Sequence, residues 1–177
     1  PKKTLEKAAG EVLPLYVVLA TGSVAEGPAA AAMSTGDLVS LVERLRARGC
    51  AVMIERSREL YRSTAFIRRY TQAPVYFAAS LRLLALLFDD ARYEGLEGRM
   101  LEGLARLFAQ NVKAFALPAP RADLARSLST QAHLKWTTAG SGEWVTAQQL
   151  KPPPPIDHLY EYLLATGFLV PIAVNTS

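Results

Sequence analysis

The sequence predicts an α/β protein with a Rossmann-like, doubly wound and mainly parallel sheet of about four to five strands, flanked by helices. Two observations predict this class. Short apolar, β-rich runs without polar alternation are typical of strands that are buried on both faces of a parallel sheet. Segments with apolar residues at helical spacing separate these runs, and their lengths suit right-handed crossover connections.

The first predicted strand is the apolar run PLYVVLAT at Pro14–Thr21. The clearest helix covers Asp37–Arg48 and stops at Gly49. Its apolar residues recur at positions i, i+3, i+4 and i+7, which places them on one face: Leu38, Leu41, Val42 and Leu45. Further strands are predicted at 50–55, 74–80 and 112–118, and further helices at 57–71, 81–88, 96–108 and 156–167, the last of which leads into FLVPI.

The predicted organisation is a polar N-terminal arm at 1–13, a single α/β domain at 14–172 and a tail at 173–177. Residues 119–155 interrupt the domain with an irregular excursion. The turn signal AGSG within it indicates a hairpin or an insertion. The run PPPP at Pro152–Pro155 predicts a short, stiff polyproline II spacer.

Composition indicates an ordinary globular protein and excludes several classes. Half of the 177 residues are apolar, one fifth are charged, and the net charge is +4. We expect no transmembrane segment and no nucleic-acid partner, because apolar runs are short and basic charge is not concentrated. Cys50 is the sole cysteine, so an internal disulfide is excluded and a reducing compartment is expected. Since the chain begins with Pro1, we expect that a leader was cleaved or left out.

The turn after the first strand, ATGSVAEGP, is where an α/β fold usually binds phosphate. Gly22 and Gly27 match neither GxGxxG nor a P-loop. Tight packing of a strand against the next segment also explains small residues at this place. The ligand-binding candidates are therefore Thr21, Gly22 and Ser23.

No other pattern in the sequence predicts catalysis. His133, His158 and Cys50 lack the spacing of metal ligands, and no nucleophile elbow surrounds a serine. We predict no catalytic residues, no metal site and no cofactor. The acidic residues of the central region are interpreted as a solvated helix face: Asp89, Asp90, Glu94, Glu97 and Glu102.

The stretch LYRSTAFIRRYTQAP suggests a contact surface. On one helix over 57–71, Arg58, Arg62 and Arg69 fall within about 40° of one another. Such a stripe is either a solvated face or a surface for an acidic partner, and we favour a protein partner over a small anion. Trp136 and Trp144, in the excursion, are either local anchors or further partner contacts.

Several stretches together resemble the C-terminal α/β domain of a bacterial family named nicotinate or nicotinamide mononucleotide adenylyltransferase, and in part TonB-dependent receptor. These stretches are YRSTAFIRRYT, YEGLEGRMLEGLARLF, NVKAFALP, QQL and HLYEYLLATGFLVPI, within about residues 36–172. The name implies nucleotidyl transfer, which uses an HxGH motif after the first strand. This sequence has GSVAEGPAAAA there, and its first histidine is His133.

Two functions follow from these observations. We favour a non-catalytic accessory subunit of a larger assembly, with other protein subunits as partners. An Ala- and Arg-rich composition with a cleaved leader is typical of mitochondrial proteins, so a respiratory complex or ATP synthase is the suggested setting, and the cytoplasm is the other compartment. The alternative is a nucleotide-binding or nucleotidyltransferase-like enzyme that uses the Gly22 turn.

Overall fold

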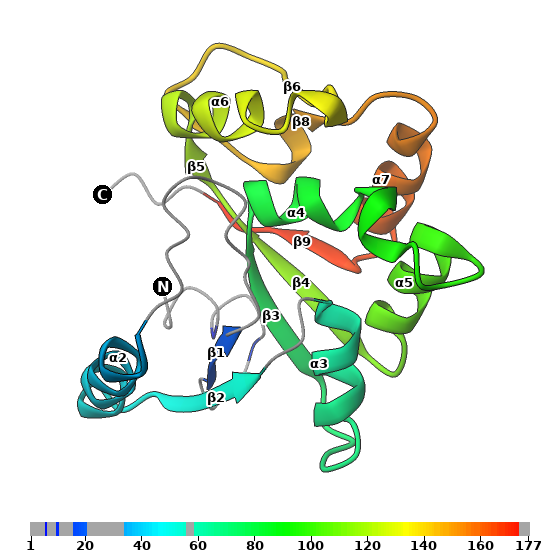
Figure 1. The fold of residues 1–177 in the computed structure, drawn as a ribbon. Coiled ribbons are helices and arrows are strands. Elements are labelled where there is room, and N and C mark those ends of the chain that lie inside the picture. The colour runs from blue at the N-terminus through cyan, green and yellow to red at the C-terminus, as the bar shows by residue number, and fades with distance from the viewer. Residues whose placement is uncertain (1–5, 7–9, 11–15, 21–33, 56–58, 174–177) are drawn as a thin grey trace. The chain divides into compact units, whose positions relative to one another are not determined.

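The computed structural model describes residues 6, 10, 16–20, 34–55 and 59–173. These residues form a mixed α/β protein whose parallel sheets have two and three strands (Figure 1). The predicted α/β class is therefore confirmed, whereas one sheet of four to five strands stays a prediction. The chain divides into two compact units, Pro1–Phe66 and Ile67–Ser177. Among the helices that the structure describes, none is both long and apolar enough to cross a membrane.

The first unit contains a parallel pair of strands, β1 (Tyr16–Ala20) and β2 (Ala51–Glu55), in which Tyr16 lies opposite Ala51. The connecting helix is α2 (Thr35–Ala47). Its N-cap is Ser34, whose Oγ accepts a hydrogen bond of 3.1 Å from the Asp37 backbone N–H.

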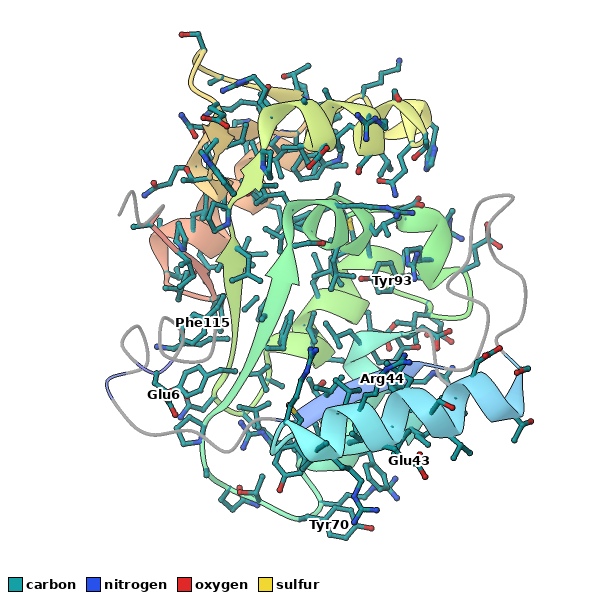
Figure 2. The ribbon with its side chains drawn as sticks, turned by 90° about the vertical axis from the view of Figure 1, so that its left-hand side faces the viewer. Glu6, Glu43, Arg44, Tyr70, Tyr93 and Phe115 are labelled. Atoms are coloured by element: carbon teal, nitrogen blue, oxygen red, sulfur yellow. The ribbon has the colours of Figure 1, made fainter. Side chains whose placement is uncertain are left out.

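The two faces of α2 agree with the predicted pattern. Glu43 and Arg44, labelled in Figure 2, are exposed on this helix. The four apolar residues of the predicted face are half-buried instead: Leu38, Leu41, Val42 and Leu45. Gly49 follows the helix with φ +76°, a conformation that suits glycine, as its predicted role as a stop signal requires.

The helix predicted over 57–71 is shorter in the structure. It is α3 (Leu60–Ile67), and residues 68–70 form a turn. Arg69 therefore lies beyond the helix, and the prediction of one helix carrying three aligned arginines is wrong at this end.

The second unit is built on a parallel sheet with the order β3-β4-β9. Its strands are β3 (Val75–Ser80), β4 (Val112–Leu117) and β9 (Leu169–Pro171). The first two are close to the predicted ranges 74–80 and 112–118, whereas no strand range was predicted within FLVPI. The central strand β4 has buried residues on both faces, including Ala114, Phe115 and Ala116. This burial agrees with the absence of polar alternation in its sequence.

Helices α4 (Leu81–Leu87), α5 (Arg99–Phe108) and α7 (Ile156–Ala165) supply much of this unit's core. The 3-10 turn η1 (Asp90–Tyr93) precedes α5, and its Tyr93 is labelled in Figure 2. The Tyr93 hydroxyl donates a hydrogen bond of 2.8 Å to the Leu87 carbonyl oxygen. Gly103 of α5 lies directly against the Tyr93 ring.

Three aromatic side chains from distant segments form a cluster in this core. Phe88, Trp136 and Tyr160 meet edge to face, with ring centroids 5.4–5.7 Å apart. The Tyr160 hydroxyl donates a hydrogen bond of 2.8 Å to the Ala147 carbonyl oxygen, and burial raises the pKa of Tyr160. Trp136 is 7% exposed, so it is a local anchor and is not available at the surface as the predicted partner contact.

The excursion at 119–155 is more regular than its sequence suggested. It contains α6 (Arg121–Ser129), the 3-10 turns η2 (Ala132–Leu134) and η3 (Ala147–Gln149), and four two-residue strands. These strands are β5 (Ala119–Pro120), β6 (Thr137–Thr138), β7 (Trp144–Val145) and β8 (Leu150–Lys151). Figure 1 shows α6, β6 and β8 at the α4 end of the second unit.

Two local predictions in the excursion are corrected. The AGSG turn lies between β6 and β7, but β6 pairs with β8 and β7 pairs with β5, so these flanks form no hairpin. The proline run is not an extended spacer along its whole length. Pro154 and Pro155 lie in a turn that the Ile156 N–H closes, with a bond of 3.0 Å to the Pro153 carbonyl oxygen.

Candidate functional site

The structure places the predicted site residues in different environments. Thr21, Gly22, Ser23 and Arg58 lie outside the described residues. Arg62 is exposed on α3, where its Nε donates a hydrogen bond of 3.3 Å to the Tyr61 hydroxyl and lies 3.4 Å from Glu59 Oε2. Tyr61 and then Glu59 raise the pKa of Arg62. Part of its charge is thus already matched within the chain.

An arginine that sequence reasoning missed, Arg68, has a structural role. It is 9% exposed, and its guanidinium donates to the carbonyl oxygens of Thr71, Ala73 and Asn111 at 3.4, 2.5 and 3.0 Å. These bonds join the turn after α3 to the residue before β4. A helical wheel offers no signal for this role, because Arg68 follows the last residue of α3 and lies in the turn at 68–70.

Trp144, another predicted partner-binding residue, lies at the surface, on a segment that several hydrogen bonds fix in place. Its side chain is 39% exposed, while the neighbouring Val145 is fully buried. The backbone of Trp144 pairs with Pro120 in the antiparallel β5–β7 ladder. An indole with one side on the protein and the other in solvent can serve as an anchor for a partner.

Arg121, at the start of α6, fixes the loop that leads to Trp144. Its Nε donates a hydrogen bond of 2.7 Å to the Gly142 carbonyl oxygen, and Nη2 donates one of 3.1 Å to the Ala139 carbonyl oxygen. Its Nη1 donates to Thr138 Oγ1 at 2.7 Å. The Arg121 backbone N–H adds a bond of 2.7 Å to the Glu143 carbonyl oxygen. One side chain therefore holds both sides of the AGSG turn.

Gly140 in the AGSG turn has φ +74°, a conformation that favours glycine. The other side of the loop is fixed by η3, where Gln149 Oε1 accepts a hydrogen bond of 2.9 Å from the Thr146 N–H. The Ala139 N–H also donates to the Gln149 carbonyl oxygen at 2.7 Å. The segment that carries Trp144 is consequently held at several points along its length.

Two of the acidic residues, Asp89 and Asp90, make local structural contacts. Asp90 Oδ1 accepts from the Met100 N–H at 3.1 Å, and Oδ2 accepts from Arg99 Nε at 2.9 Å, which ties η1 to the start of α5. The Arg99 guanidinium and the Met100 N–H lower the pKa of Asp90. Asp89 Oδ2 lies 3.3 Å from His133 Nε2. Within the described ranges, no three His, Cys, Asp or Glu side chains gather as a metal ion would require.

The remaining candidates from the sequence have ordinary surroundings. Cys50 is a half-buried, free thiol immediately before β2. His158 is exposed on α7, and its backbone N–H donates to Asp157 Oδ1 at 3.0 Å. Among the predicted partner-binding residues that the structure describes, Trp144 combines an exposed aromatic side chain with a segment held by several hydrogen bonds.

In comparisons with known proteins, no protein-family model, curated protein or solved structure matches the chain.

Proposed function

We propose that this protein is a non-catalytic accessory subunit of a larger assembly and that it contacts its neighbour through Trp144. The observation that supports this most directly is the exposure of Trp144 on a segment fixed by Arg121. Aromatic residues dominate the energetics of protein interfaces, and a rigid presentation lowers the entropy lost on binding. The surface is small, so further residues of the chain would have to contribute to the interface.

The assembly we propose is a mitochondrial respiratory complex or ATP synthase. This part of the proposal rests on composition and on the arginines of the second quarter of the chain. In the same proposal, the α/β domain derives from an enzyme, and the resemblance to the bacterial adenylyltransferase-named family reflects that ancestry.

Trp144→Ala is expected to weaken binding to the partner by about 30-fold, because truncation of an interface anchor costs about 2 kcal/mol. The tagged chain is purified from the source organism, and the co-eluting proteins are quantified by mass spectrometry. Arg121→Ala should also reduce recovery, since it releases the loop. Tyr162→Ala is the matched control, because Tyr162 is an exposed aromatic (58%) on α7, outside the excursion.

Thermal unfolding of each variant separates lost binding from lost folding. Equal recovery of partners with Trp144→Ala and with the wild-type chain would contradict the role of Trp144. Recovery of the wild-type chain alone, as a monomer, would contradict the accessory-subunit function itself.

We further propose that the five parallel strands, β1, β2, β3, β4 and β9, belong to one Rossmann-like, doubly wound sheet. The alternation of strands and helices along the chain supports this. As separate sheets of two and three strands, they have four edge strands, whereas one sheet has two. Amide hydrogen exchange distinguishes these cases, because amides of paired strands are protected. Rapid exchange of the outward-facing backbone amides in each of the four edge strands, β1, β2, β3 and β9, would argue against a single sheet.

A further inference from the structure

No further inference is drawn: the strongest candidate, the apolar surface that Tyr16, Val18 and Ile54 expose on strands β1 and β2 of the first unit, carries none, because nothing in the part of the chain that the structure describes shows what covers it.

Discussion

Gly103→Ala is expected to destabilise the second unit by about 3 kcal/mol, the upper end of the usual cost of overpacking a core. A Cβ atom at this position would lie 2.2 Å from Cδ1 and Cε1 of the Tyr93 ring. The ring cannot move aside easily, because Tyr93 is 6% exposed and its hydroxyl is bonded to the Leu87 carbonyl oxygen. Chemical denaturation monitored by circular dichroism measures the change.

The sign of the effect makes this prediction specific. Glycine to alanine inside a helix normally stabilises it by about 1 kcal/mol, so the structure predicts the opposite of helix propensity at Gly103. Gly95→Ala is the control, since a Cβ there would meet no atom within 4 Å. In a Tyr93→Ala background, Gly103→Ala should cost much less. Equal costs in both backgrounds would show that the two residues do not touch.

Arg68→Met is expected to lower the free energy of unfolding by about 3 kcal/mol, because hydrogen bonds to a charged group contribute about 1.5–3 kcal/mol each and are not additive. Methionine keeps most of the aliphatic stem, and it leaves the carbonyl oxygens of Ala73 and Asn111 without the guanidinium donor. Urea denaturation of the two proteins, with equal slopes, gives the difference directly.

Two further variants test the assignment of Arg68. Arg68→Lys should recover little of the loss, because a single ammonium group cannot reproduce the separate bonds that Nη1 and Nη2 donate to the carbonyl oxygens of Ala73 and Asn111. Arg69→Ala, one position on and exposed, should change stability by less than about 0.5 kcal/mol. A larger effect from Arg69 than from Arg68 would reverse the roles given to the two residues.

The strands and helices could be predicted because each depends on a local pattern. The apolar run in VKAFALP and the helical spacing after Asp37 each determine an element within a residue or two of its observed limits. The end of α3 could not be predicted in this way. Arg68 follows the helix, and its guanidinium donates a hydrogen bond to the Asn111 carbonyl oxygen, 43 positions further along the chain. No local pattern in the sequence signals that contact.

The candidate site was predictable only in part for the same reason. Trp136 and Trp144 have similar neighbours in the sequence, but Trp136 meets Phe88 and Tyr160 in the core, and Trp144 does not. Arg121 gave no sequence signal, because its partners in the AGSG turn are backbone carbonyl oxygens. Backbone groups are the same for every residue type, so composition does not indicate where they converge.

The order β3-β4-β9 makes β3 and β9 the edge strands of this sheet, and edge strands affect whether the second unit, produced alone, would aggregate. β9 is three residues long and ends at Pro171, and short strands with proline are poor templates for aggregation. β3 is six residues long and contains neither proline nor a charged side chain, and among the described strands it pairs with β4 alone. A truncated product that begins at Ile67 would present this strand to other copies, so its solubility would benefit from a lysine in place of Ala78, which is exposed.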